Sequence, residues 1–131
     1  MTDIDFGSWT NAELNTLVND PEFSRFNRQR TLAKPPSGEM TWEVEARMMS
    51  ELFRILAEHP NSTVVVVGHA DPLRVALCHL LGFPLDLSQR LDVRPGSVSR
   101  IETGDDCSLS LFNYVPGEFG HCGGDPGAPP Q

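Results

Sequence analysis

The apolar residues are densest near the middle of the chain, where Thr63 is followed by four valines and then by Gly68. An uninterrupted run of β-branched residues is typical of a strand that is buried on both faces, as in a parallel sheet. We therefore predict a strand at residues 63–67 that needs parallel neighbours. The sequence before Thr63 contains no segment that reads as such a neighbour.

A helix is predicted directly after this strand. Asp71 is suited to cap the helix, Pro72 to be its first residue and Gly82 to end it. Apolar residues recur at intervals of three and four along one face, at Leu73, Ala76, Leu77, Leu80 and Leu81. His69 lies between the strand and the helix. Because the carboxyl ends of strands and the first amides of helices bind ligands and anions, we expect His69 to face a phosphate group.

Two further helices are predicted before the valines. The first begins near Thr10, which has the capping-box spacing with Glu13, and ends before Pro21. The second is capped by Thr41 and runs to about residue 58. Its buried stripe consists of Val44, Met48, Leu52, Ile55 and Leu56. Residues 23–34 between the two helices mix aromatic and basic side chains and allow no assignment.

After the central helix, the pattern predicts a hairpin. Residues 98–102 and 109–115 alternate well enough to be two strands, joined across the Gly-Asp-Asp sequence at residues 104–106. From residue 116 the chain is rich in glycine and proline and has little to bury, so we predict that residues 116–131 form a disordered tail.

Composition and charge narrow the function classes. The chain has 131 residues, enough for one domain, and its formal net charge of −8 argues against nucleic acid or an anionic membrane as a partner. No apolar run is long enough to cross a bilayer, and no secretory leader is evident. The three cysteines have no metal-ligand spacing, and their odd number does not fit a disulfide framework. We expect reduced thiols in a cytoplasmic protein.

Each candidate residue also has a plainer structural interpretation. A single histidine after a strand is more often structural, so only its sequence context favours a function for His69. Arg47 is expected to pair within the fold, and Arg74 to be solvated. His69, Asp71 and His79 together suggest a metal site, but His79 lies two helical turns further on, so we expect no metal there.

In this context, several motifs in order resemble the histidine phosphatase superfamily, which has the phosphoglycerate-mutase-like fold. They are the acidic and Phe-Gly-x-Trp residues at 3–9, the Pro-Pro-Ser-Gly-Glu sequence at 35–39, Arg47, the VVVVGHADPLR sequence at 64–74, and residues 94–99 with Asn113. The resemblance covers about residues 3–114.

The resemblance implies roles for three residues. In the family, a histidine in an Arg-His-Gly motif takes the phosphoryl group, and two arginines and two histidines hold it. By the resemblance, His69 is the second histidine, and His69 and Ala70 bind the substrate. Asp3 lies where the family often has glutamate, so it would be the acid that protonates the leaving oxygen. The implied partner is a small phosphorylated metabolite, and no cofactor or metal is implied.

The sequence departs from the family in one respect, because no arginine in it is followed by histidine. It therefore resembles the C-terminal two-thirds of such a protein, without the nucleophile and the arginines that clamp the phosphate. The expected fold is α/β, a three-layer phosphoglycerate-mutase-like sheet truncated at the N-terminus, with residues 1–115 as a partial domain.

Two functions follow as hypotheses. The first is a histidine-phosphatase-family phosphomonoester hydrolase, impaired in this chain, and a mutase outcome stays open beside it. The second is a non-catalytic remnant that acts as a binding or interaction module. In either case, the loss of a neighbouring strand would leave an apolar sheet edge at the valines, so we expect self-association through that edge.

Overall fold

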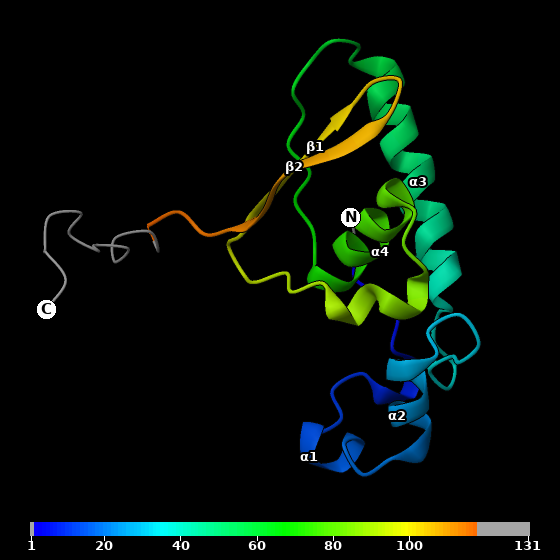
Figure 1. Ribbon diagram of the computed structural model, residues 1–131. Helices are drawn as coiled ribbons and strands as arrows, with labels where there is room; N and C mark the ends of the chain where they lie inside the picture. The colour runs from blue at the N-terminus through cyan, green and yellow to red at the C-terminus, as the bar shows by residue number, and fades with distance from the viewer. Residues whose placement is uncertain (1, 118–131) are drawn as a thin grey trace, which may run out of the picture. The chain divides into compact units, whose positions relative to one another are not determined.

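The computed structural model describes residues 2–117, and Figure 1 shows the order of its elements. The chain divides into two compact units, one up to Val93 and one from Arg94 onward. The first unit contains the helices: the short 3₁₀ helix η1, α1, α2, α3, α4 and the 3₁₀ helix η2, which span Gly7–Trp9, Leu14–Leu17, Pro21–Arg28, Thr41–Glu58, Ala70–Leu81 and Leu85–Arg90. The second contains strands β1 and β2, Val98–Thr103 and Cys107–Tyr114.

Helix α3 has the predicted span, Thr41–Glu58. Its N-cap residue is Met40 rather than Thr41, and the carboxylate of Glu43 accepts a 2.7 Å hydrogen bond from the Met40 backbone N–H. This bond satisfies one of the donors that every helix start leaves without an intrahelical partner. Thr41 is instead fully buried at the first helical position.

The buried stripe of α3 is shorter than the periodicity predicts. Val44 and Met48 are buried as expected, and Met49 is buried as well. Towards the C-terminal end, the predicted Leu56 is 39% exposed. The helix therefore packs through its N-terminal half, and its last turns extend beyond the core.

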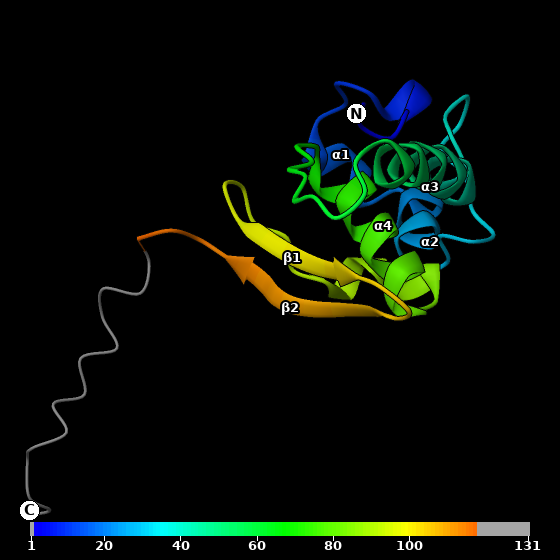
Figure 2. The same ribbon diagram turned by 90° about the horizontal axis from the view of Figure 1, so that it is seen from above.

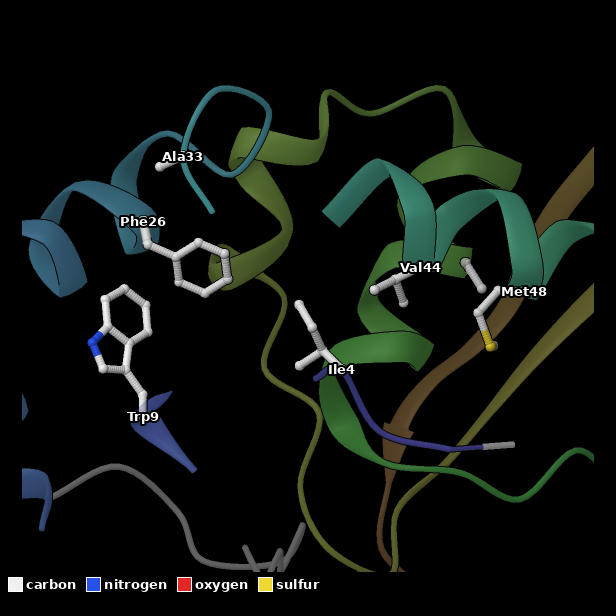
Figure 3. Packing of buried hydrophobic residues seen from close by; sticks show 7 residues of the cluster. Ile4, Trp9, Phe26, Ala33, Val44 and Met48 are labelled. Atoms are coloured by element: carbon white, nitrogen blue, oxygen red, sulfur yellow. The ribbon is translucent and has the colours of Figure 1, made fainter. Parts of the chain in front are cut away.

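One hydrophobic core joins the N-terminal residues to α2, α3 and α4. Figure 3 shows Trp9 beside Phe26 of α2, and Val44 and Met48 of α3 close to Ile4. The Trp9 and Phe26 ring centroids are 5.8 Å apart. A second, smaller cluster packs α4 against η2 through Val75, Cys78 and Leu85. Both clusters belong to the first unit.

Helix α4 confirms the predicted helix, but it begins earlier than expected. Ala70 is its first residue and His69 its N-cap, so Asp71 and Pro72 lie inside the first turn. The predicted end is confirmed: Gly82 has φ +71°, a left-handed conformation that glycine adopts at little cost, and its N–H bonds back to the last turn.

The predicted valine strand is absent, and this is the main correction to the expected fold. Residues 62–69 belong to no helix or strand (Figure 1), and Val65 and Val67 are 82% and 81% exposed. Within residues 2–117 the only sheet has two strands, so the expected three-layer sheet is not present there. A strand needs a neighbour to satisfy its backbone groups, and no segment among the described residues pairs with the valines.

The predicted hairpin is confirmed in the second unit. Strands β1 and β2 pair in antiparallel fashion across residues 104–106 (Figure 2), with Thr103 opposite Cys107 and Val98 opposite Tyr114. The side-chain oxygen of Asn113 accepts a 2.9 Å hydrogen bond from the backbone N–H of Arg94. This bond connects the start of the unit to β2. Residues 118–131 lie outside the described residues, so most of the predicted disordered tail remains a prediction.

Backbone hydrogen bonds join the N-terminal segment to the segment that contains the Pro-Pro-Ser-Gly turn. The Ser8 N–H donates to the Pro36 carbonyl at 2.9 Å, and the Glu39 N–H donates to the Asp5 carbonyl at 2.8 Å. Gly7 lies between these bonds with φ +54°, and a Cβ atom added to it would lie 2.1 Å from the Pro36 oxygen. The close approach of the two backbones therefore requires glycine at position 7.

The predicted helix near Thr10 is much shorter than expected, and residues 23–34, for which no element was predicted, contain most of a further helix. Helix α1 is a single turn, no side chain caps it, and Leu14 and Val18 are 66% and 64% exposed. The first helix does end before Pro21, as predicted, but Pro21 also begins a second helix: α2 has Pro21 at its first position, and the Asp20 carboxylate accepts from the Glu22 N–H at 2.8 Å.

Candidate functional site

His69 lies at an open position immediately before α4. It is the N-cap residue of that helix, with φ −82° and ψ 161°, and its side chain is exposed. Within residues 2–117 its ring makes no hydrogen bond or ion pair. The backbone carbonyl of His69 accepts the first helical bond, from Leu73 at 3.2 Å. The imidazole is therefore available to a ligand at the start of the helix.

The first turn of α4 offers backbone donors at this position. Ala70 and Asp71 begin the helix, so geometry gives their N–H groups no intrahelical acceptor, whereas Pro72 has no N–H to offer. The aligned peptide dipoles add a partial positive charge at this end of the helix. Two amides and an exposed imidazole together form a site suited to a small anion.

A buried ion-pair cluster fixes this first turn. The Asp71 carboxylate accepts hydrogen bonds from Arg30 at 3.2 Å, from Arg74 at 2.9 Å and from Gln89 at 3.1 Å. Arg74 also donates from Nε to the Leu91 carbonyl at 2.8 Å. Two guanidinium groups thus share one carboxylate, which leaves one excess positive charge beside the helix start in a chain whose net charge is −8.

The sequence analysis did not single out Arg30, which pairs with Asp71 beside the start of α4. It comes from the segment that allowed no assignment, yet it is only 3% exposed, and its guanidinium lies 4.1 Å from the centre of the Phe26 ring. Its Nε atom is buried with no acceptor within the described residues. Arg74, predicted to be solvated, is in fact half-buried and paired. Its spacing of three residues from Asp71 on a helix could have signalled that pair.

The guanidinium groups around Asp71 lower the pKa of its carboxyl. Burial alone would raise that pKa, but the charge of Arg30 and the hydrogen bonds from Gln89, Arg74 and Arg30 outweigh it. Burial lowers the pKa of Arg30, against the opposing charge of Asp71, yet a guanidinium stays protonated at neutral pH. The pair is therefore ionised at neutral pH.

This lowered pKa predicts a pH dependence of stability. A carboxyl whose folded pKa lies below its ordinary value of 3.8 stabilises the fold above that pH, and the contribution is lost as the pH falls through the folded pKa. We expect Asp71→Asn to cost about 2 kcal/mol at pH 7 in urea unfolding followed by tryptophan fluorescence, and much less below pH 3.8. Asp105→Asn, in the exposed hairpin turn, is the control. A constant difference between wild type and Asp71→Asn from pH 7 to pH 3 would contradict the prediction.

Asp3, the predicted general acid, has no hydrogen bond to this cluster within residues 2–117. Its carboxylate accepts a 2.8 Å bond from the N–H of Ile4, and no described bond joins it to His69. Arg47 holds the adjoining backbone, donating to the Thr2 and Asp3 carbonyls at 3.1 and 2.9 Å and to Glu39 at 2.8 Å. The structural interpretation of Arg47 is thereby confirmed. His69 and Ala70 lie at the start of α4, and no hydrogen bond among the described residues joins Asp3 to them.

Within residues 2–117, the other histidine and cysteine side chains lie apart from one another in separate contacts. His79 pairs with Glu45 of α3 at 2.8 Å, and within residues 2–117 no three His, Cys, Asp or Glu side chains are placed to hold a metal ion. Cys78 and Cys107 are free thiols, and burial, together with the charge of Glu45, raises the pKa of Cys78. Cys122 lies outside the described residues. No described helix combines the length and the apolar character that a bilayer crossing requires.

Comparison with known proteins decides the family. A family model described as "Histidine phosphatase superfamily (branch 1)" matches residues 1–114. The chain belongs to the histidine phosphatase superfamily. The family predicted from the ordered motifs is thus confirmed, over nearly the same residues.

Individual histidine phosphatase relatives agree with this assignment. A probable phosphoglycerate mutase from Cronobacter sakazakii is 31% identical over 106 residues, which cover 78% of this chain and 48% of the relative. The solved structure of YhfR from Bacillus stearothermophilus matches with a TM-score of 0.78 and 25% identity, over 86% of this chain and 58% of that one. A phosphoserine phosphatase mutant from Entamoeba histolytica, solved in complex with phosphoserine, has the same fold with a TM-score of 0.75 at 17% identity, again covering 86% and 58%.

The chain spans only part of the histidine phosphatases that it matches, between 31% and 48% of the length of the curated relatives. Its sequence contains no Arg-His-Gly motif. The comparisons show membership of the family and an α/β fold. Because the chain covers only part of its relatives, the roles of His69, Ala70 and Asp3 remain predictions.

Proposed function

We propose that this chain binds the phosphoryl group of a small phosphomonoester at the start of α4, and that this site serves phosphomonoester hydrolysis. The observation that carries the proposal is the exposed ring of His69, which makes no bond within residues 2–117, at the N-cap of a helix whose first amides have no intrahelical acceptor. The excess positive charge of Arg30 and Arg74 over Asp71 favours an anion at the same place.

In the proposed reaction, as in the family, the nucleophile is the Arg-His-Gly histidine, which this sequence does not contain and the whole protein would have to supply. Its nitrogen attacks phosphorus, the N–P bond forms and the ester O–P bond breaks. Asp3 gives its proton to the leaving oxygen. The Asp3 carboxylate then takes a proton from water, the water oxygen attacks phosphorus, and the N–P bond breaks to release inorganic phosphate and the free histidine. His69 and the amides of Ala70 and Asp71 stabilise the charge on the transferring group throughout.

The names of two relatives support a small monoester as the ligand class. One is called a phosphoglycerate mutase, and the other was solved with phosphoserine bound. Both compounds are phosphate monoesters of small carboxylic acids. We therefore take phosphoserine as the probe for this site.

A second candidate function is a non-catalytic phosphate-binding module. It is favoured by the absence of an Arg-His-Gly sequence and by the pairing of Arg30 and Arg74 with Asp71, which leaves neither guanidinium wholly free to clamp a ligand. A phosphohistidine route requires a nucleophile. Binding without turnover is the result that distinguishes this module from the enzyme.

The test combines calorimetric titration with phosphoserine and turnover of p-nitrophenyl phosphate. We expect wild-type chain to bind phosphoserine, and His69→Ala to bind it about tenfold more weakly, since one charge-assisted hydrogen bond is worth about 1.5 kcal/mol or more. His79→Ala is the matched control, because His79 lies on the same helix and pairs with Glu45 instead.

The outcomes separate the candidates. Turnover that falls in His69→Ala but not in His79→Ala supports the hydrolase, and binding without turnover supports the module. Equal phosphoserine affinity in wild type and His69→Ala would overturn both, because neither candidate leaves His69 without a role in holding the phosphoryl group.

A further inference from the structure

The Asp71 carboxylate lies in the first turn of α4, yet within residues 2–117 it bonds to none of the backbone amides of that turn. An acidic side chain at a helix start is attracted by the free amides there. Both Asp71 oxygens bond to side chains instead: Oδ1 accepts from Arg74 at 2.9 Å and from Gln89 at 3.1 Å, and Oδ2 accepts from Arg30 at 3.2 Å. The amides of Ala70 and Asp71 make no hydrogen bond within the same residues.

Arg30 is the partner of Asp71 that the core holds in place. It is 3% exposed, and its Nη2 atom donates to the Asn27 side chain at 3.1 Å. Its guanidinium lies 4.1 Å from the centre of the ring of Phe26, which is fully buried in the main hydrophobic core. All of these residues belong to the first unit. Arg30 is therefore a fixed cation beside the helix start, and the Asp71 carboxylate bonds to it.

We propose that Arg30 is a positioning residue of the phosphate site: it holds the Asp71 carboxylate away from the amides of Ala70 and Asp71, so that these amides stay open to a phosphoryl group. This inference rests on the proposed function, because it concerns the same site. Without Arg30, Oδ2 loses the one partner that it has within residues 2–117. The donors without a partner in its own turn are the two amides. A carboxylate bound to them would displace a phosphoryl group and repel it.

The charges beside the helix start separate this role from a purely structural one. Arg30 and Arg74 share the single carboxylate of Asp71, which leaves one excess positive charge. Arg30→Met removes that excess, whereas Asp71→Asn adds a second positive charge to it. Both substitutions break the same ion pair, so a role in the fold alone would make both impair the site. A positioning role predicts opposite effects on phosphate binding.

Calorimetric titration with phosphoserine tests this difference. We expect Arg30→Met to bind phosphoserine about tenfold more weakly than wild type, because the site loses a positive charge and gains a competing carboxylate. Asp71→Asn should bind more tightly than wild type, and Arg30→Met/Asp71→Asn should recover most of the lost affinity. Arg28→Met is the matched control, since Arg28 is an exposed arginine in the last turn of α2, and it should bind as wild type does. Circular dichroism checks that each variant is folded.

Amide hydrogen exchange followed by NMR tests the position of the carboxylate without a ligand. The amides of Ala70 and Asp71 should exchange about tenfold more slowly in Arg30→Met than in wild type, because the carboxylate then accepts from them. Equal exchange rates, or equal losses of phosphoserine affinity in Arg30→Met and Asp71→Asn, would overturn the inference. A wild-type chain that binds no phosphoserine would overturn the proposed function, and the exchange rates would still decide whether Arg30 holds the carboxylate off the amides.

Discussion

Gly7→Ala is expected to lower the free energy of unfolding of the first unit by about 3 kcal/mol or more, one of the two largest effects that we predict for a single substitution in this chain. The left-handed backbone at φ +54° costs a residue with a Cβ about 1–2 kcal/mol. The new Cβ would also lie 2.1 Å from the Pro36 carbonyl oxygen. Since that neighbour is backbone, no side-chain rotation relieves the contact, and the segments carrying the Ser8–Pro36 and Asp5–Glu39 bonds must separate.

Gly82→Ala provides the matched control. Gly82 has φ +71°, so alanine meets the same conformational cost, but the space around its Cβ is open. It should lose only about 1–2 kcal/mol in urea unfolding followed by tryptophan fluorescence. The difference between the two variants measures the backbone contact alone. Equal losses would show that the two segments part without cost.

Arg30→Met is expected to cost about 2–3 kcal/mol, although methionine matches much of the volume of the arginine stem. Removing one member of a buried ion pair leaves its partner less well compensated. Here Arg74 and Gln89 continue to donate to Asp71, so the cost falls at or below the lower end of the usual range. The hydrogen bond from Arg30 to Asn27 and the contact with the Phe26 ring are lost as well.

Arg28→Met is the matched control for this substitution, because Arg28 is exposed in the last turn of α2. It should change stability by less than about 0.5 kcal/mol. A double-mutant cycle with Asp71→Asn should show a coupling of about 1 kcal/mol or more. If the two arginine variants unfold at the same urea concentration, the buried pair contributes nothing to the fold.

The parts of the fold that follow from local sequence were predicted closely. The end of α4 at Gly82, the span of α3 and the hairpin about residues 104–106 all depend on periodicity and turn residues within a few positions of each other. The prediction of the valine strand was wrong because a strand depends on residues far away in the sequence. Its composition indicates only that these residues favour a strand, and a strand forms only when another segment supplies its hydrogen bonds.

The sequence likewise predicted only the local part of the candidate site. His69 was placed at the start of a helix because the residues on either side of it define that junction. The pair between Arg30 and Asp71 could not be predicted, since 41 positions separate the two residues and no periodicity links them. The family motifs predicted the superfamily itself, because motifs in a fixed order carry information that no single residue has.

The separation of those polar partners along the chain also affects biosynthesis. Arg30 and Thr31 bond to Asp71 and Asp86, which lie 41 and 55 positions later. The ribosome therefore releases the aromatic core of the N-terminal segment and the apolar face of α3 well before α4 and η2 exist to cover them. In that interval Phe26 and Val44 lack part of the core that covers them in the folded unit, and a pause in translation before residue 86 would prolong that exposure.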